Sequence, residues 1–259
     1  MDVRAWLPPG LLFRYVCGME MFHVNHSTLF PADSIISANS LTRVYPMGES
    51  GVAGLRGVDL RVPAGAMVVL KGVSGSGKST LLALLAGLDR PTSGSLRVAG
   101  VDLVNAGEAE LTDFRRRIVG MVFQSFNLMP TMNVLENVLL PALLAGRDER
   151  ASRGRAMELL DWLGMAPRVG HSPAQLSGGE MQRTAIARAL INDPAIILAD
   201  EPTGNLDSES SHAVVALLAE LNRIMGRTVI VATHANLADP YATLRLLLTD
   251  GRLTQPVAD

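Results

Sequence analysis

The stretch from residue 66 to residue 85 reads AMVVLKGVSGSGKSTLLALL. Its first five residues are apolar and β-branched in part, as in a short buried strand. Residues 72–80 then fit the pattern G-x-x-x-x-G-K-[ST], and leucines recur at helical spacing at positions 81, 82, 84, 85 and 88. The stretch therefore predicts a strand, a glycine-rich phosphate-binding loop and a helix in direct succession.

Each part of this loop has a chemical reason to bind phosphate. Glycines let backbone N–H groups turn inward around phosphate oxygens, and the following helix adds its positive end. Lys78 can supply a compact charge to terminal phosphates, and the Ser79 hydroxyl can ligate Mg²⁺. Only Lys71 and Lys78 of the 23 basic residues are lysines, so a lysine stands where a narrow loop needs a point charge on a thin stem. The other loop residues predicted to contact the nucleotide are Gly72, Ser74, Gly75, Ser76, Gly77 and Thr80.

Further apolar runs extend this pattern to an α/β fold with a largely parallel sheet. Residues 195–199 and 228–232 are candidate buried strands, and they alternate with longer segments of helical period. Between Gln124 and Ser177 the strand signal fades. Residues 134–144 and 151–163 predict amphipathic helices there, which we expect to be separated by Pro141, Gly146, Gly164 and Pro167. We interpret this part of the chain, about residues 125–190, as an inserted helical subdomain.

Composition excludes several classes of protein. With 48% hydrophobic residues among 259, the chain can bury a sizeable core, which excludes wholesale disorder. The net charge of −2 lacks the field that would hold a long nucleic acid backbone, so no nucleic acid partner is expected. Cys17 is the only cysteine, which excludes an intramolecular disulfide and fits a reducing compartment. No apolar run approaches the ~20 residues of a membrane span, so we expect a cytoplasmic chain.

A second acidic motif ends the predicted strand at residues 195–199. Asp200 and Glu201 follow it directly, and neighbouring strand residues point to opposite sides, so the two carboxylates have different tasks. Asp200 is suited to hold Mg²⁺, while Glu201 can face the terminal phosphate and activate a water molecule. Taken alone, such an acid pair is more often a solvated turn or a helix cap. The phosphate loop makes the catalytic interpretation the better one.

Together these motifs closely resemble the ATP-binding cassette (ABC) ATPases. Residues 176–180, LSGGE, look like the signature motif of that family, and they precede residues 199–207, ADEPTGNLD, as the family requires. The resemblance covers residues 35–253. It implies that Gln124 belongs to the glutamine loop and ligates Mg²⁺, that His234 is the switch histidine, that Asp207 belongs to the D-loop, and that Tyr45 stacks on adenine.

The resemblance also implies a dimer of two copies. In the family, the signature residues Ser177, Gly178, Gly179 and Glu180 bind the γ-phosphate held by the opposite subunit, so two ATP molecules are sandwiched between the copies. Ser177 and Glu180 also fit a capping box, which is compatible with that role because a helix start can bind an anion. All the consensus elements are intact in one chain, which favours a homodimer with two competent sites. Glu201, His234 and Lys78 are the predicted catalytic residues.

The finer resemblance is to the bacterial subgroup that serves lipoprotein release and macrolide efflux. It rests on residues 87–94, 123–130, 136–141 and 199–207. It implies a separate ATPase subunit, bound peripherally at the cytoplasmic face of the inner or plasma membrane, that drives an integral membrane permease. The alternative is an ATP-gated clamp of the cell-division type that signals through a membrane partner without moving cargo. The chain departs from common family patterns at Ala66, Val73 and Ala235, the last of which stands where an aspartate is frequent.

Two segments stay open to more than one interpretation. Phe123, Phe126, Leu128 and Met129 either dock a cytoplasmic helix of the permease or fill the core of the helical subdomain. Arg115, Arg116 and Arg117 are interpreted as a solvated helix face rather than a nucleic acid contact. We expect the cassette to span residues 35–253, with a tail at 254–259. Residues 1–34 form an N-terminal extension that is either flexible or an error in the assigned start, since Met19 and Met21 offer later starts.

Overall fold

The computed structural model describes residues 34–46 and 51–254 of the chain. The expected N-terminal extension, residues 1–34, lies outside the described residues except for its last residue. The expected tail, residues 254–259, lies outside them except for its first.

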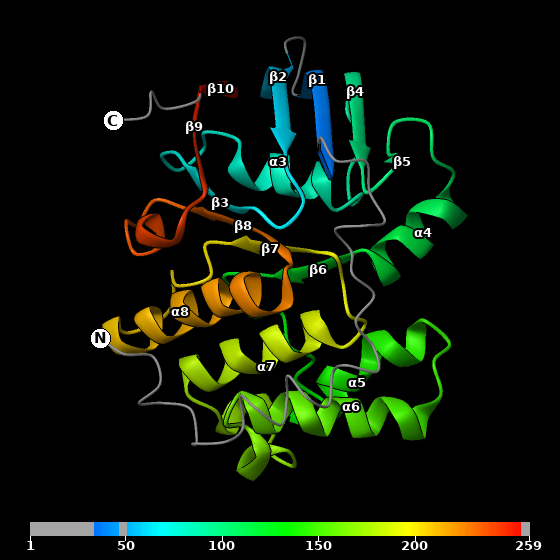
Figure 1. Ribbon diagram of the computed structural model, residues 1–259, viewed down its shortest axis with the longest axis vertical. Coiled ribbons are helices and arrows are strands. Elements are labelled where there is room, and N and C mark those ends of the chain that lie inside the picture. Colours follow the sequence, from blue (N-terminus) through cyan, green and yellow to red (C-terminus); the bar gives the residue numbers. More distant parts are fainter. Residues whose placement is uncertain (1–33, 47–50, 255–259) are drawn as a thin grey trace.

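Two β-sheets organise the described part of the chain (Figure 1). The larger sheet has the order β10-β9-β3-β8-β7-β6, and its strands are parallel except for the antiparallel pair of β9 and β10. The smaller sheet has the order β2-β1-β4-β5 and is antiparallel. The large-sheet strands are β3 (Met67–Lys71), β6 (Val119–Val122), β7 (Ile196–Asp200), β8 (Thr228–Thr233), β9 (Leu244–Thr249) and β10 (Arg252–Thr254). The small-sheet strands are β1 (Ile36–Tyr45), β2 (Val52–Val62), β4 (Ser93–Val98) and β5 (Val101–Asp102).

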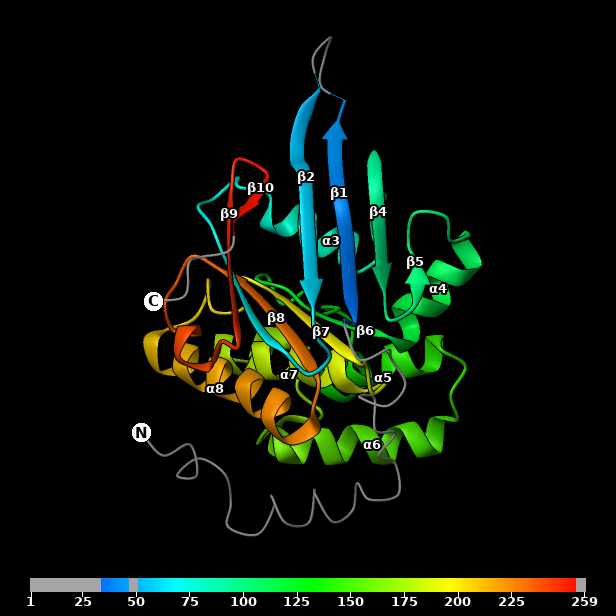
Figure 2. The ribbon, with the colours of Figure 1, turned by 45° about the horizontal axis from the view of Figure 1, so that its top comes forward.

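Helices cover both faces of the large sheet. In two views, α5, α6, α7 and α8 lie on one side of it, and α3 lies on the other side with the small sheet (Figures 1 and 2). The α/β fold with a mostly parallel sheet, an antiparallel part and a helical insertion is thereby confirmed. The helices are α3 (Lys78–Leu85), α4 (Glu108–Arg117), α5 (Val134–Leu144), α6 (Glu149–Trp162), α7 (Gly178–Leu190) and α8 (Ser208–Met225), with short 3₁₀ turns at Ala166–Arg168, Pro173–Gln175 and Asp239–Tyr241.

Strand β3 shows how the two faces are held. Val68 and Leu70 belong to the hydrophobic core shared with the small sheet and α3, whereas Met67 and Val69 belong to the core shared with α5 to α8. Successive side chains of a strand point to opposite faces, so a slip of one residue would exchange the two sets. Both sets are fully buried, and this fixes where β3 ends and the phosphate loop begins.

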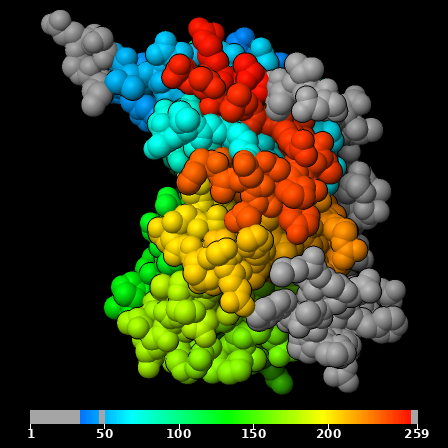
Figure 3. All heavy atoms as spheres, turned by 90° about the vertical axis from the view of Figure 1, so that its left-hand side faces the viewer, coloured from blue at the N-terminus to red at the C-terminus, as the bar shows by residue number. Residues whose placement is uncertain are grey.

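The two sheets meet at the carboxyl-terminal hairpin. The backbone N–H of Arg56 in β2 donates to the carbonyl of Gly251, between β9 and β10, at 2.7 Å. The space-filling view shows these last strands (red) lying beside the blue residues that begin the small sheet (Figure 3). The hairpin therefore joins the small sheet to the edge of the large one.

Two local expectations were wrong, and a third holds only in part. Pro141 does not separate helices, because it lies inside α5, which continues to Leu144. Leu88 lies beyond the end of α3 and is 56% exposed, so it does not extend the leucine face of that helix. The expected solvated face holds for Arg116 and Arg117, which are exposed, but Arg115 is half-buried and its guanidinium donates to the Gly87 carbonyl at 2.8 Å.

Asn137 organises the chain between β6 and α5. Its side chain is fully buried in α5, accepts from the backbone N–H of Met129 at 2.7 Å, and donates to the carbonyls of Met129, Met132 and Asn133 at 3.0–3.2 Å. One amide thus satisfies four backbone groups of an otherwise irregular segment.

Replacing Asn137 with alanine should destabilise the fold by about 3 kcal/mol, because several backbone groups would lose their only side-chain partner away from water. Denaturant unfolding of the full chain measures this. The matched control is Asn105→Ala: Asn105 is exposed and donates only to Asp102 at 2.9 Å, so its loss should cost less than about 1 kcal/mol. Equal losses in the two variants would contradict the role given to Asn137.

Candidate active site

The phosphate loop leaves β3 through backbone conformations that glycine adopts easily. Gly77, at φ +107°, caps α3, and a Cβ there would collide with the carbonyl oxygen of Gly54 in β2. Gly75, at φ +79°, borders open space. The loop therefore combines a left-handed turn against β2 with an open side where a ligand can approach the backbone. Of the predicted serines, Ser76 is 3% exposed, and its hydroxyl is buried without a hydrogen-bond partner in the described chain.

Lys78 lies folded back over this loop. Its Nζ donates to the carbonyl oxygens of Gly72 at 2.7 Å and Val73 at 3.2 Å, and it lies 3.3 Å from Oε1 of Glu201. The side chain is only 6% exposed. A buried ammonium needs this many partners, and its position at the centre of the loop places positive charge where anionic oxygens would enter.

Ser79 and Asp200 form a second pair at the start of α3. The Ser79 hydroxyl donates to the carboxylate of Asp200, whose Oδ1 is buried without a hydrogen-bond partner in the described chain. Burial raises the pKa of Asp200, and the charge of Glu201 raises it further, while the Ser79 hydrogen bond and Lys78 oppose both. An unpaired, buried carboxylate oxygen beside a hydroxyl suits a hard cation that completes its shell with other oxygens.

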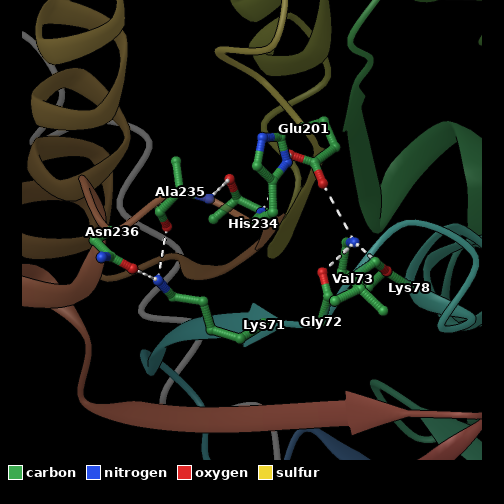
Figure 4. A network of polar contacts seen from close by, with 9 residues as sticks. Lys71, Gly72, Val73, Lys78, Glu201, His234, Ala235 and Asn236 are labelled. Carbon is green, nitrogen blue, oxygen red and sulfur yellow. Dashed lines mark hydrogen bonds and ion pairs between the residues drawn. The ribbon is translucent and has the colours of Figure 1, made fainter.

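Glu201 connects the loop to the end of β8. Its Oε2 contacts Nδ1 of His234 at 3.0 Å, while Oε1 faces Lys78 (Figure 4). Burial would raise the pKa of Glu201, but the hydrogen bond and charge of His234 and the charge of Lys78 outweigh it, so the pKa lies below the ordinary glutamate value. Glu201 also has φ +44°, a left-handed conformation that side-chain-bearing residues adopt at a cost.

Gln124 approaches this site from the loop after β6. A Cβ on Gly204 would lie 2.6 Å from the side-chain Nε2 of Gln124, so the amide packs directly on the turn that follows Glu201. The backbone carbonyl of Gln124 accepts from the Asn205 side chain at 3.1 Å. The glutamine loop and the loop after β7 are therefore held together.

Tyr45 lies beside the phosphate loop but is tied to residues that the sequence did not indicate. Its hydroxyl donates to Asp89 at 2.9 Å, and the guanidinium of Arg43, itself paired with Asp89, lies 4.5 Å above the ring centre. A Cβ on Gly54 would come within 3.0 Å of both Tyr45 and Thr80, so the ring approaches the first turn of α3. Arg43 and Asp89, 46 residues apart, were missed because no local pattern links them.

The signature residues start α7 and form the predicted capping box. The Ser177 hydroxyl accepts from the N–H of Glu180 at 3.2 Å, and the Glu180 carboxylate accepts from the N–H of Ser177 at 2.8 Å and from Arg168 at 2.9 Å. The hydrogen bond from the Ser177 backbone is the main reason that the pKa of Glu180 lies below its ordinary value, and Arg168 adds to it against the effect of burial.

The structure divides the predicted site residues into two groups. Lys78, Glu201 and His234 meet at the carboxyl ends of β3, β7 and β8 (Figure 4). The signature glycines pack elsewhere, Gly178 against Leu206 and Gly179 against Ser210. Asp207 caps α8 through its contacts to the N–H and hydroxyl of Ser210, and these hydrogen bonds lower its pKa.

A groove lies between α4, β6 and the α5 and α7 helices. Apolar side chains from Met121, Phe123, Pro141 and Leu144 line it together with the Arg188 guanidinium. Phe123 therefore faces the groove, whereas the Phe126 ring comes within 4.0 Å of a Cβ placed on Gly178, and Met129 is 46% exposed. Leu128 is partly buried. None of the helices within residues 34–46 and 51–254 has the combined length and hydropathy of a transmembrane segment.

The chain is similar to several known proteins. The family model described as ABC transporter matches residues 55–204. The chain is 44% identical over 220 residues to the lipoprotein-releasing system ATP-binding protein LolD of Geobacter metallireducens, covering 85% of this chain and 98% of that protein. It is 48% identical over 232 residues to the macrolide export ATP-binding/permease protein MacB of Rhodopseudomonas palustris, covering 88% of this chain but only 35% of that protein's length.

A solved structure is also similar to this chain. A dimeric structure of the ATP-binding cassette MJ0796 in a post-hydrolysis state, bound to ADP and Pi, is similar with a TM-score of 0.80 and 38% identity. The similarity covers 86% of this chain and 100% of that one.

The Glu180 carboxylate should make the stability of the fold depend on pH. Because its folded pKa lies below the ordinary value of 4.5, the carboxylate stabilises the fold above about pH 4.5, and this contribution is lost as pH falls through the folded pKa. Glutamine can also complete a capping box. Glu180→Gln should therefore cost about 0.5–1 kcal/mol at pH 7, and the difference from the unaltered chain should shrink on acidification.

Urea unfolding at a series of pH values measures this difference. The control Glu209→Gln changes an exposed glutamate in the first turn of α8 and should have little effect at any pH. A loss for Glu180→Gln that stays constant from pH 7 to about pH 3 would contradict the assignment.

Proposed function

Because the chain belongs to the ABC transporter family and is an ATP-binding, ATP-hydrolysing cassette of it, we propose that it is the subunit that powers a separate membrane permease of the lipoprotein-release or macrolide-efflux type. The similarity to LolD, an ATP-binding protein by name, extends over nearly the whole of that protein. MacB, whose name joins ATP-binding and permease functions, is matched over about a third of its length. This supports a role as the energy-coupling partner of a permease.

The contact between Lys78, Glu201 and His234 carries the proposal for hydrolysis. Lys78 binds the terminal phosphate oxygens of ATP once they replace the Gly72 and Val73 carbonyls as its partners. Glu201, whose pKa is lowered, is ionised at neutral pH and can accept a proton from a water molecule aimed at the γ-phosphate. His234, with its side chain 71% exposed, donates a hydrogen bond to the same phosphate. Catalysis then consists mainly of positioning and charge stabilisation.

The residues fit a magnesium ion. Mg²⁺ favours one or two carboxylates, together with phosphate oxygens and water, over a full cage of protein ligands. Asp200 and Ser79 provide a buried, unpaired carboxylate oxygen and a hydroxyl, and Gln124 is a third candidate ligand. The part of the chain that the structure describes holds no group of three His, Cys, Asp or Glu residues arranged for a metal. When bound, the ion neutralises charge on the phosphates.

We further propose that two copies of the chain close around two ATP molecules. Within one copy the signature helix packs on Leu206 and Ser210, so its glycines do not serve the phosphate loop of the same chain. A helix start capped by Ser177 presents N–H groups that suit an anion supplied by a second copy. The similar MJ0796 cassette is described as dimeric with ADP and Pi bound.

The permease is proposed to dock in the groove between α4, β6 and the α5–α7 pair. The groove exposes an apolar floor, and Leu88 and Leu144 stand at it with 56% and 60% of their surfaces exposed. Such a surface suits a short amphipathic helix. Docking there would place the chain peripherally at the cytoplasmic face of the membrane, and we propose no nucleic acid partner.

Glu201→Gln tests the catalytic assignment. The amide cannot accept the proton of the attacking water, so ATP hydrolysis should fall by at least about 100-fold while ATP affinity changes by less than about threefold. With Mg²⁺ and ATP present, the variant should accumulate as a dimer in analytical ultracentrifugation. Glu209→Gln, on the exposed first turn of α8, is the control and should hydrolyse ATP normally. Normal hydrolysis by Glu201→Gln would remove Glu201 from its role.

Leu144→Lys tests the docking groove. It places a charge on an apolar surface that already holds Arg115, Arg116 and Arg188, so repulsion and desolvation should weaken docking about tenfold or more. The readout is the fraction of tagged chain that sediments with membranes of its host cell. The control Met157→Lys changes an exposed methionine of α6 and should leave the sedimenting fraction unchanged. Neither variant should change the ATPase rate measured without membranes. Equal sedimentation of the two variants would refute the groove as the docking site.

A further inference from the structure

Lys71, the only lysine besides Lys78, has no role in the proposed phosphate chemistry, yet all its N–H donors have hydrogen-bond acceptors. Its Nζ donates to the carbonyl of Ala235 at 2.7 Å, to Oδ1 of Asn236 at 2.6 Å and to Oδ2 of Asp239 at 2.9 Å. An ammonium has three N–H donors, and here three acceptors use them. Lys71 is therefore committed to protein groups, and it is not a second phosphate ligand.

All three acceptors belong to the segment that leaves β8. In the sheet, β3 lies between β8 and β9, and Lys71 pairs in register with Thr233, the last residue of β8. The connection from β8 to β9 starts beside Lys71, at the carboxyl end of β3, and runs to the other end of that strand. There the Thr243 hydroxyl accepts from the N–H of Met67 at 2.9 Å and donates to its carbonyl at 3.2 Å. Lys71 thus grips this connection at its first turn.

That first turn carries His234. The imidazole is 71% exposed, and its contact to Glu201 spans 3.0 Å, so packing alone does little to fix it. The backbone next to it is better held: the N–H of Ala235 donates to the Thr233 hydroxyl at 3.0 Å, and its carbonyl accepts from Lys71. Figure 4 shows Lys71 reaching Ala235 and Asn236 on one side of His234, with Glu201 on the other.

These contacts close a ring around the site. From Lys71 the ring passes through the backbone of Ala235 to His234, then to Glu201 and Lys78, and Lys78 returns to Gly72, the residue after Lys71. Lys71 is the link that joins the histidine turn to the start of the phosphate loop. At the end of β3, the Lys71 side chain alone donates to three oxygen atoms that converge on its Nζ. This arrangement suits a compact ammonium better than a planar guanidinium.

We infer that Lys71 is a positioning residue for ATP hydrolysis, which holds the turn at Ala235 and Asn236 so that His234 stays aligned with Glu201. The inference rests on the proposed function, in which His234 and Glu201 act on the γ-phosphate. It differs from a purely structural ion pair between Lys71 and Asp239 in one respect: the effect of Lys71 on hydrolysis must pass through His234.

A double-mutant cycle on the full chain tests this. Lys71→Met, His234→Ala and the double variant are compared by kcat and KM for ATP with Mg²⁺ present. Lys71→Met should lower kcat about tenfold and leave KM within about twofold, and His234→Ala should lower kcat about 100-fold. Because a residue that acts through His234 has nothing left to position once the imidazole is gone, the double variant should match His234→Ala within about twofold.

Matched variants separate positioning from stability. Asp239→Asn removes the charge partner but keeps both contacts to residues 235 and 236, so kcat should fall by less than about threefold. Arg117→Met breaks the exposed pair with Asp113 on α4 and should leave kcat unchanged. Thermal unfolding and binding of a fluorescent ATP analogue establish that each variant is folded. If Lys71→Met does not fold, Lys71→Arg enters the same cycle, with a smaller loss of kcat expected.

The outcomes are distinct. Multiplicative losses in the double variant, or an unchanged kcat in the Lys71 variant, would overturn the inference and leave the proposed function intact. Normal hydrolysis by His234→Ala would instead remove His234 from the proposed mechanism. A loss of kcat for Lys71→Met that vanishes in the His234→Ala background supports the inference.

Discussion

The site depends on the parallel pairing of three adjacent strands. Strand β8 pairs with β3 on one side and with β7 on the other, with Ala232 opposite both Leu70 and Asp200. Parallel strands end at the same edge of a sheet, so the phosphate loop, the acidic pair and the histidine turn leave the sheet side by side. Residues more than 120 positions apart in the chain, such as Lys78 and Glu201, can then come within 3.3 Å.

This convergence has a stability cost that the rest of the fold must offset. Lys78 is almost completely buried, one Asp200 oxygen lacks a partner in the described chain, and Glu201 has a left-handed backbone. Each feature is unfavourable in a chain selected for stability alone. The two hydrophobic cores on either face of the large sheet provide the compensation, since they bury every side chain of β3 before Lys71 and most of β7 and β8. A rigid sheet can therefore hold a polar, strained edge ready for a charged ligand.

Local sequence patterns predicted the phosphate loop, the strand before it and the helices at 134–144 and 151–163, because each of these elements follows from neighbours a few residues apart. The roles of Gln124, His234 and Tyr45 rested on resemblance to a family. What no pattern revealed were contacts between distant residues, such as Arg43 and Asp89 beside Tyr45, or Lys71 and Asp239, which are 168 positions apart. Pro141 misled for the opposite reason: local propensity predicts a break, but α5 is held by its capping box and by burial of Val138 and Ala142.

Helix α7 joins the two surfaces at which other molecules are proposed to bind. Its first turn carries the signature glycines, and near its other end Arg188 donates to the backbone carbonyls of Phe126 and Asn127, both of which have left-handed φ values of 59° and 51°. Arg188 and Ala189 also line the groove. A helix of 13 residues is about 20 Å long and stiff along its axis. A shift of the signature end on ATP-driven closure would therefore move the groove end as well, and the Arg188 contacts would carry the strained loop after Gln124 with it.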